Sequence, residues 1–315
     1  MNTTRILSNG ISLQVHTWGE PSLPPLVLVH GYPDNHQVWQ PVAETLADRF
    51  FVIAYDVRGA GGSDVPTQVS DYSMAQLSRD LLAVVDAVIP GRDFHLAGHD
   101  WGSIQSWESV TTAPLKERIL SFTTISGPCL DHMGFWMRKR FGSLSWREQR
   151  KALKQLLSSW YIVFFQLPVI PPLSWKLGIG KWWPLYLEKR EGVHEAVPNP
   201  SQTKDGQYGV NLYRANFQSK LLKPQPRYAD APVHLIVPTG DNYVGTQLFE
   251  DLHEWVSELY RRDIDANHWV PLSHAEQIAE WIGEFAEAVE SGDAARRFSS
   301  LRVRAPFASE LSLRS

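Results

Sequence analysis

Asp100 stands between two glycines in the segment Gly98-His99-Asp100-Trp101-Gly102, directly after an apolar run that begins at Phe94. Small neighbours permit a strained turn between a strand and a helix, and such a turn lifts the central side chain clear of a sheet. A carboxylate in that position is a poor nucleophile for acyl transfer, but it displaces leaving groups from saturated carbon. The spacing therefore predicts an alkyl-ester on Asp100, formed from an epoxide or a halide.

A base and a second carboxylate that suit the hydrolysis of this ester come later in the chain. His268 follows the last predicted strand and can activate water, provided that it is neutral when it accepts the proton. Asp241 lies just beyond the apolar run Val233–Val237, where it would fix the imidazole tautomer and stabilise the imidazolium. Two alternatives stay open: Asp131 as the acid, and His274 as the base, although a helix start favours a capping or supporting role for His274.

The segment His30-Gly31-Tyr32-Pro33 follows a continuous apolar run, Leu26–Val29. A loop in this position supplies one backbone N–H to an oxyanion hole, and the residue after the nucleophile supplies the second. We therefore expect the backbone N–H groups of Tyr32 and Trp101 to hold the oxyanion.

The elements that must position these groups alternate along the chain. Ile11–Trp18 alternates apolar and polar residues as a half-buried strand does, whereas continuous apolar runs are typical of strands inside a parallel sheet. Apolar residues at helical spacing mark the stretches between the runs. The pattern predicts an α/β fold with strands at 26–29, 51–56, 94–97, 119–126 and 233–237 and helices at 74–89, 103–110 and 274–289.

The stretch between the predicted strands Ile119–Ser126 and Val233–Val237 is several times longer than the roughly dozen residues that a parallel crossover needs. An inserted lid from about Gly127 to Tyr228 is the economical explanation, and its many aromatic residues predict an apolar pocket that excludes water. The expected division is a core in two parts, 1–126 and 229–292, a helical cap at 127–228, and a flexible tail at 293–315.

Composition limits the partners, the cellular location and the cofactors that the chain is expected to have. The chain has 315 residues, 43% of them hydrophobic, and a net charge of -4, which argues against nucleic acid and anionic membranes as general partners. The apolar run Trp160–Trp175 is shorter than the roughly 20 residues of a membrane span and is interrupted by prolines. A polar N-terminus and a lone cysteine, Cys129, predict a cytoplasmic protein. The glycine-rich turn at 58–63 lacks the dinucleotide-binding spacing, so no cofactor is expected.

Over nearly its whole length, from about Ile11 to Val289, the sequence resembles the epoxide hydrolases of the α/β-hydrolase superfamily, especially the hydrolase portion of some actinobacterial fusions with a short-chain dehydrogenase. The segments at 30–33 and 98–102 match the family's His-Gly-x-Pro and nucleophile motifs, and the order nucleophile, Asp, His is the superfamily's order. The resemblance implies a mostly parallel eight-stranded sheet flanked by helices, with an inserted helical cap.

Two cap tyrosines carry the specific part of the resemblance. Tyr161 begins a Tyr-x-x-x-Phe-Gln match, and Tyr213 lies in an Asn-x-Tyr-Arg match. In the family this pair hydrogen-bonds the epoxide oxygen. The sequence departs from the family at Tyr32, where Phe is usual, at Asn267, where Gly is usual, and at Leu167-Pro168-Val169, where Glu-Pro-Gly is frequent. These departures concern the shape of the pocket.

Opening an epoxide generates an alkoxide, which needs a proton donor such as a tyrosine of pKa about 10, whereas a halide needs none. The sequence therefore predicts a cofactor-independent, metal-free epoxide hydrolase for a small apolar epoxide, active as a monomer or homodimer without nucleic-acid or membrane partners. A haloalkane or haloacid dehalogenase and a non-catalytic binder on the same scaffold are the alternatives. The expected pocket residues are His30, Pro33, His99, Trp160, Phe164 and Trp269.

Overall fold

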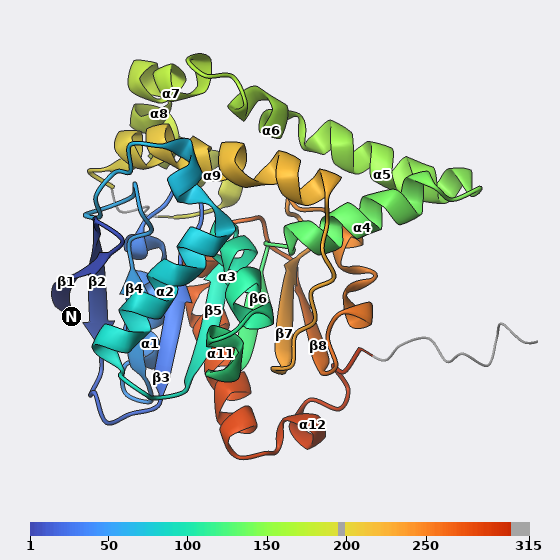
Figure 1. Cartoon of the computed structure of the whole chain (residues 1–315). Coiled ribbons are helices and arrows are strands. Elements are labelled where there is room, and N and C mark those ends of the chain that lie inside the picture. The colour runs from blue at the N-terminus through green and yellow to red at the C-terminus, as the bar shows by residue number, and fades with distance from the viewer. Residues whose placement is uncertain (195–198, 304–315) are drawn as a thin grey trace, which may run out of the picture.

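A computed structural model describes residues 1–194 and 199–303. Eight strands form one sheet in the order β1-β2-β4-β3-β5-β6-β7-β8, with β1 and β2 antiparallel to their neighbours and the others parallel (Figure 1). The mostly parallel eight-stranded sheet that the family resemblance implies is thus confirmed. The strands are β1 (Asn2–Ser8), β2 (Ile11–Trp18), β3 (Pro25–Val29), β4 (Phe51–Tyr55), β5 (Phe94–His99), β6 (Ile119–Ile125), β7 (Val233–Pro238) and β8 (Leu259–Ile264).

Helices cover both faces of the sheet because its central strands are apolar on both sides. Val27 and Val29 of β3 pack in the cluster that includes α2 (Met74–Val88) and α3 (Trp101–Thr111). Leu26 and Leu28, which alternate with them, pack in the cluster that includes α1 (Gln40–Leu46) and α11 (Ala275–Glu290). This period of two explains why the central strands lack the polar alternation of an edge strand.

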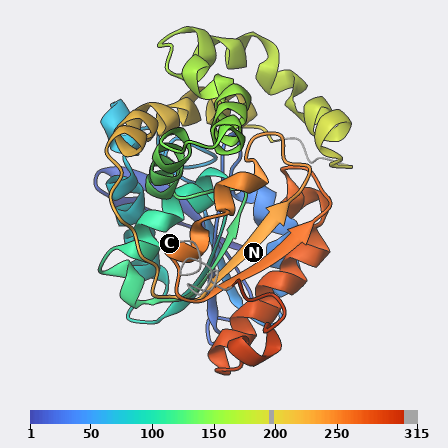
Figure 2. The same cartoon turned by 90° about the vertical axis from the view of Figure 1, so that its right-hand side faces the viewer.

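A layer of helices lies over the carboxyl ends of the parallel strands, at the top of Figure 1 and again in the side view of Figure 2. We call residues 130–194 and 199–222 the cap. No helix in the described ranges is long and apolar enough to cross a membrane. The cap helices are α4 (Leu130–Phe141), α5 (Trp146–Ser158), α6 (Trp160–Phe165), α7 (Ile170–Ser174), α8 (Gly180–Glu191) and α9 (Gln202–Leu222).

The region after the last long helix differs from the expected flexible tail. Helix α12 (Ala294–Arg297) begins there, and Phe298 is buried against Tyr260 and Phe285. The backbone N–H of Val303 donates to the carbonyl of Leu259 in β8. Burial of the Phe298 ring therefore ties residues 293–303 to the sheet, and the rest of the expected tail, 304–315, lies outside the described residues.

Candidate active site

The turn between β5 and α3 holds Asp100 in a conformation that few non-glycine residues adopt, with φ 51° and ψ -123°. The tight packing around this turn leaves no room for a side chain at Gly98 or Gly102. A Cβ on Gly98 would lie 2.6 Å from the carbonyl oxygen of Gly102, and a Cβ on Gly102 would collide with the backbone of Val29. The close approach of these segments explains the small residues, and the strained turn presents the Asp100 carboxylate above the sheet.

Two groups approach the Asp100 carboxylate from different loops. The backbone N–H of Tyr32 donates to its Oδ2 over 2.8 Å. Nε2 of His268 lies 3.5 Å from Oδ1. Trp101 begins α3, and the N–H groups of a first helical turn lack acceptors within the helix. One expected oxyanion donor therefore already contacts the carboxylate, and the second belongs to the adjacent residue.

Asp241 holds the opposite edge of the His268 ring, with 2.8 Å between Oδ2 and Nδ1. Its other oxygen accepts the backbone N–H groups of Tyr243 and Val244, so the carboxylate is fixed on both sides. Burial acts against the charge of His268, but the carboxylates of Asp241 and Asp100 outweigh it and hold the pKa of His268 well above the usual value. Burial opposes ionisation of Asp241 as well, yet the charge of His268 leaves the pKa of Asp241 lowered.

The two alternatives for the acid and the base lie in other surroundings. Asp131 forms ion pairs with Lys220 at 3.0 Å and Arg227 at 3.1 Å, beside the cap helix α9. His274 occupies the N-cap position of α11, where its ring is 2.9 Å from the hydroxyl of Ser273. The structure thus brings Asp241 and His268 to Asp100 and gives Asp131 a role in an ion-pair cluster.

Tyr161 in α6 and Tyr213 in α9 meet above Asp100. Their ring centroids are 6.1 Å apart and the rings are nearly perpendicular. Both tyrosines, Asp100 and His268 line one cavity of about 210 Å³. The remaining lining side chains are mostly aromatic or otherwise apolar: Tyr32, Pro33, Trp160, Phe164, Phe165, Trp175, Ile179, Trp183, Tyr243 and Trp269.

Both tyrosines keep their protons near neutral pH. Burial, and then the negative charge of Asp100, raises the pKa of the Tyr161 hydroxyl and that of the Tyr213 hydroxyl well above the usual value. No protein acceptor among the described residues engages either hydroxyl, so both protons are available to a ligand oxygen. A neutral phenol in an apolar pocket is a hydrogen-bond donor of the kind that a developing alkoxide requires.

Two of the six expected pocket residues point elsewhere. Nε2 of His30 accepts the backbone N–H of Val57 over 2.8 Å, so this ring braces the loop below the pocket. Nε2 of His99 lies 2.9 Å from the carbonyl oxygen of His268, and burial lowers the pKa of His99 to about 4. Neutral His99 therefore donates to this carbonyl and supports the loop that carries His268. Pro33, Trp160, Phe164 and Trp269 do line the cavity.

The sequence analysis missed several groups that support the site. Glu191, at the end of α8, accepts the backbone N–H of His268 over 3.0 Å. Tyr243 packs edge-on against the His268 ring at 5.1 Å between centroids. Tyr243 could have been predicted from the sequence, because it follows Asp241 by only two residues. Asp34 accepts the indole N–H of Trp269 over 2.8 Å, and burial raises the pKa of Asp34 to about 7.

Tyr32, the departure from the family's phenylalanine, has partners for its hydroxyl. The hydroxyl donates to the carbonyl of Gly206 in α9 over 3.0 Å and accepts the indole N–H of Trp175 over 2.7 Å. A phenylalanine would leave the buried Trp175 N–H without this acceptor. The extra hydroxyl therefore belongs to the contact between the loop after β3 and the cap.

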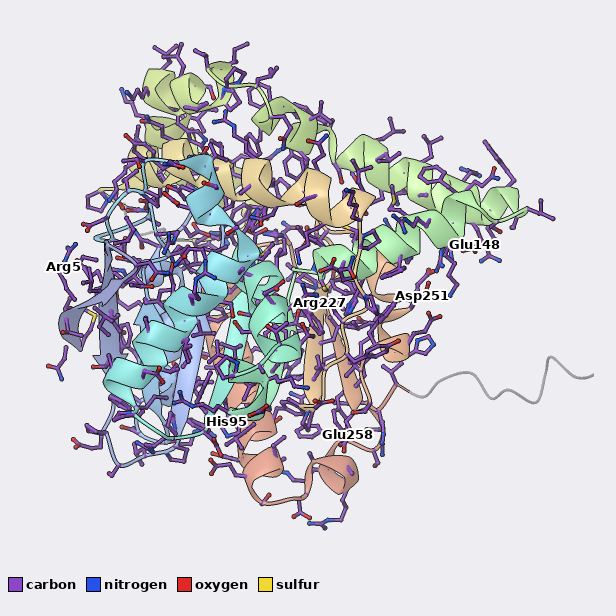
Figure 3. All side chains as sticks on the ribbon, viewed as in Figure 1. Arg5, His95, Glu148, Arg227, Asp251 and Glu258 are labelled. Carbon is purple, nitrogen blue, oxygen red and sulfur yellow. The ribbon has the colours of Figure 1, made fainter. Side chains whose placement is uncertain are left out.

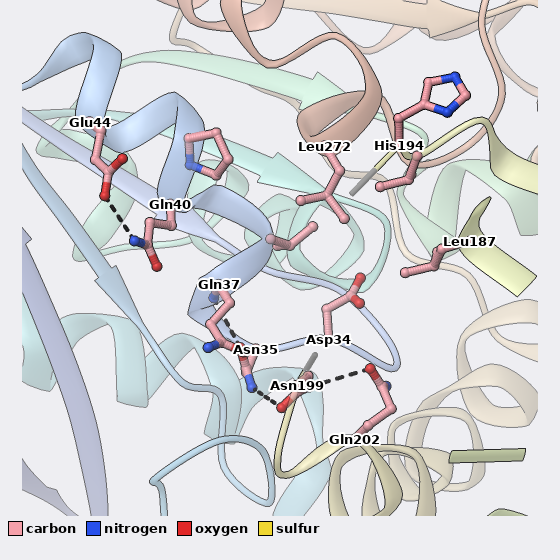
Figure 4. A pocket seen from close by; sticks show the side chains of 13 residues that line it. Asp34, Asn35, Gln37, Gln40, Glu44, Leu187, His194, Asn199, Gln202 and Leu272 are labelled. Atoms are coloured by element: carbon pink, nitrogen blue, oxygen red, sulfur yellow. Dashed lines mark hydrogen bonds between the residues drawn. The ribbon is translucent and has the colours of Figure 1, made fainter. Parts of the chain in front are cut away.

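A larger cavity of about 320 Å³ lies beyond Asp34, and Figure 4 shows its lining. Polar side chains from the loop after β3, from α1 and from the cap surround it, and Asn35 donates to Asn199 across it over 2.9 Å. Asp100 and His268 line the smaller cavity instead. The catalytic residues therefore line the smaller of these two cavities.

One further cluster deserves comparison with a metal site. His16, His36 and Asp56 have ligand atoms within 4.8 Å of one another. The two imidazole rings are stacked at 3.5 Å with 17° between their planes, so an ion between them would lie outside both ring planes. The carboxylate of Asp56 already accepts N–H groups of His36 and Gly62. Hydrogen bonding accounts for this cluster.

The chain is similar in sequence to known proteins over most of its length. The family described as the alpha/beta hydrolase fold matches residues 24–275. The probable oxidoreductase EphD of Mycobacterium tuberculosis is 33% identical over 312 residues, which cover 95% of this chain and 51% of that protein. Epoxide hydrolase 3 of Xenopus tropicalis is 25% identical, over 89% of this chain and 76% of that protein. The chain thus spans about half the length of the mycobacterial relatives that it matches.

Solved structures share the fold. An epoxide hydrolase of Bacillus megaterium in complex with an inhibitor has a TM-score of 0.74 at 18% identity, covering 90% of this chain and 100% of that chain. One of the epoxide hydrolases from metagenomes of hot environments has a TM-score of 0.73 at 23% identity, over 94% and 99% of the two chains.

Proposed function

The chain belongs to the alpha/beta hydrolase fold family, and on that premise we propose that it hydrolyses epoxides to vicinal diols through an ester on Asp100. The observation that carries the proposal is the pocket in which two tyrosine hydroxyls share an apolar cavity with a carboxylate and a histidine. The names of relatives such as epoxide hydrolase 3 support the same substrate class.

In the first step a carboxylate oxygen of Asp100 attacks a carbon of the epoxide, and the carbon–oxygen bond of the ring breaks. The electron pair moves to the ring oxygen, which takes a hydrogen bond and then a proton from Tyr161 or Tyr213. A positioned general acid of this kind contributes about 10²- to 10⁴-fold to the rate. The products of the step are an alkyl-ester on Asp100 and a free hydroxyl on the neighbouring carbon.

In the second step His268 takes a proton from water, and the hydroxide attacks the carboxyl carbon of the ester. The backbone N–H groups of Tyr32 and Trp101 hold the oxyanion, and Asp241 stabilises the imidazolium. The ester bond then breaks, and the diol oxygen receives the proton held by His268. Asp100 is left as a carboxylic acid, whose proton returns to the tyrosinate and restores both groups. The sum is one epoxide and one water to one diol, with no cofactor in the balance.

A dehalogenase would use the same nucleophile but would expel a halide in place of the epoxide oxygen. Halide requires N–H donors, and the indole Nε1 of Trp101 has no hydrogen-bond partner among the described residues. Of the indoles that line the cavity, that of Trp175 already donates to Tyr32, whereas that of Trp183 has no partner among the described residues. The two phenol groups in the same cavity can supply the proton that an alkoxide needs, and they favour an oxygen leaving group over a halide.

The test supplies styrene oxide and a chloroalkane to separate samples of the protein and measures diol and halide. We expect diol from the epoxide, little halide, and neither product from Asp100→Ala. In a single turnover in H₂¹⁸O, the first diol should carry unlabelled oxygen while the label enters Asp100. Halide release without diol would assign the site to dehalogenation, and label in the first diol would exclude the ester.

Three narrower proposals accompany the activity. The substrate is a small apolar epoxide, because the cavity of about 210 Å³ is lined mostly by aromatic rings. The location is the cytoplasm, and the assembly is a monomer or homodimer, as the sequence predicts. Size-exclusion chromatography with light scattering measures the assembly directly.

A further inference from the structure

The outer surface of the cap is apolar where a helix normally turns polar side chains to solvent. Leu153 and Leu157 are four residues apart in α5, which places them on one helical face, and Trp160 begins the next helix, α6. All three are exposed, Leu157 by 68% and Trp160 by 66%. An apolar stripe turned away from the core marks a binding surface.

The next segments of the cap also expose large apolar side chains. Val163 in α6, Leu177 after α7 and Trp182 in α8 are exposed by 72%, 76% and 60%. Figures 1 and 3 show α5, α6 and α7 in succession along the edge of the cap farthest from the sheet, with side chains projecting outward. We call Leu153, Leu157, Trp160, Val163, Leu177 and Trp182 the outer cap face.

The stretch of chain that carries this face contains basic residues and no acidic ones, and one of the basic residues, Lys151, pairs with Glu148 and Glu250 from outside the stretch. From 149 to 187 the sequence contains no aspartate or glutamate, although the whole chain has a net charge of -4. Arg150, Lys154, Lys176 and Lys181 lie in this stretch, and none has an ion-pair partner among the residues that the structure describes. Glu148, just before the stretch, is engaged by Arg140, which also pairs with Asp251 of the core (Figure 3).

The mouth of the catalytic pocket opens on this surface. Trp160 and Ile179 line the cavity that contains Asp100, and they are also exposed, by 66% and 38%. An apolar molecule that leaves a hydrophobic phase at the outer cap face can therefore enter the cavity without crossing bulk water. The position of the mouth connects the surface with the site.

We propose that the outer cap face docks on an anionic lipid bilayer, with the pocket mouth turned toward the membrane. Apolar side chains enter the boundary between head groups and acyl chains, exposed indoles lie at the head-group level, and the unpaired cations contact anionic head groups. A second copy of the chain fits this face poorly. A twofold interface would place identical cationic patches opposite each other with no acid from this stretch to pair them.

The sequence analysis expected no membrane partner because the whole chain has a net charge of -4. The proposed docking differs from that expectation because it depends on the local charge of the cap. It is a surface contact, so it requires no spanning helix. It also stands independently of the proposed epoxide chemistry, because binding to a bilayer is measured without substrate.

Flotation with vesicles tests the proposal. Wild-type protein should float with vesicles of mixed phosphatidylcholine and phosphatidylglycerol, and more weakly with pure phosphatidylcholine. Arg150→Glu/Lys154→Glu should weaken binding to the mixed vesicles by about 10-fold or more, and Leu157→Gln/Val163→Gln should weaken binding to both. Circular dichroism and diol formation from styrene oxide should remain those of the wild type.

Matched controls lie far from the cap. Arg297→Glu/Arg302→Glu reverses two exposed charges near α12, at the opposite end of the molecule (Figure 1), and Leu7→Gln removes an exposed leucine from β1. These controls should bind vesicles as the wild type does. Absence of wild-type binding to mixed vesicles, or equal loss in the controls, overturns the proposal. A dimer in light scattering that Leu157→Gln dissociates assigns the face to a second copy and overturns it as well.

Discussion

Nε2 of His268 lies 3.5 Å from Oδ1 of Asp100, close enough for the charge of the nucleophile to act on the base. Together with Asp241, that charge holds the pKa of His268 well above its usual value, against the effect of burial. Esterification removes the negative charge of Asp100. The first step of the proposed reaction therefore lowers the pKa of His268 before the second step needs a neutral imidazole.

Asp100→Asn mimics this loss of charge and should lower the pKa of His268. The measurement is a histidine NMR titration in which His268→Gln identifies the resonance. Asp131→Asn is the matched control, since Asp131 pairs with Lys220 and Arg227. An unchanged His268 titration in Asp100→Asn would contradict the coupling.

His268→Gln should halt the reaction after the first step, because no base then activates water. Mass spectrometry of the protein after incubation with an epoxide should show a stable adduct on the peptide that contains Asp100. A variant that turns over without accumulating the ester would place the base elsewhere, with His274 the first residue to examine.

Asp241→Asn should slow ester hydrolysis by about 10²- to 10⁴-fold, since the neutral amide neither fixes the tautomer nor stabilises the imidazolium. Asp131→Asn should leave single-turnover hydrolysis near the wild-type rate, although it weakens an ion-pair cluster that joins α4 to α9. The opposite result, with a stalled ester only in Asp131→Asn, would transfer the acid role to Asp131.

Tyr161→Phe and Tyr213→Phe should each slow alkylation of Asp100, and the double variant should nearly abolish it, because the emerging alkoxide then lacks a donor. Stopped-flow or quenched-flow measurement of the first step gives the rate. Tyr32→Phe is the matched control in the same pocket, since its hydroxyl bonds to Gly206 and Trp175 and not to a ligand. It should lower stability and leave alkylation nearly intact. A folded double variant with the wild-type alkylation rate would make dehalogenation the leading function.

Asp34 makes stability depend on pH. Burial raises its pKa from 3.8 to about 7, so the folded state holds a proton that the unfolded state releases between these values. Stability from this group is present below pH 4 and is lost as the pH rises through 7. Asp34→Asn keeps an acceptor for Trp269 and removes the titration.

The stability of Asp34→Asn relative to wild type should therefore rise by roughly 2 to 3 kcal/mol between pH 5 and pH 8. Urea unfolding at the two pH values measures this difference. Asp48→Asn, at an exposed carboxyl, is the control and should run parallel to the wild type. A parallel profile for Asp34→Asn would show that Asp34 is ionised in the folded protein throughout this range.

The central strands and the turn at Asp100 could be predicted because local residue types determine them. Continuous apolar runs marked β3, β4 and β5, and two glycines marked the turn. Strand β1 escaped prediction because Asn2–Ser8 lies at the edge of the sheet with mostly exposed side chains, so burial imposes little pattern on it.

The supporting residues could not be predicted from local patterns, because each depends on a contact between distant segments. Glu191 and His268 meet only after the cap has folded over the sheet. His99, by contrast, was misplaced although a local rule applied. It precedes Asp100 at the end of β5, and successive side chains of a strand point to opposite sides, so a residue next to the nucleophile turns away from the pocket.

Tyr32 serves the sheet domain with its backbone and the cap with its side chain. Its N–H holds Asp100, while its hydroxyl is bonded to Gly206 of α9 and to Trp175. A cap that swings outward must break these two bonds or drag the loop with it, and in the second case the backbone N–H of Tyr32 moves away from Asp100. Gln202 of α9, which donates to the carbonyl of Pro33, ties the same loop to the cap. Opening of the cap and displacement of the anion-binding donor are consequently linked through the loop after β3.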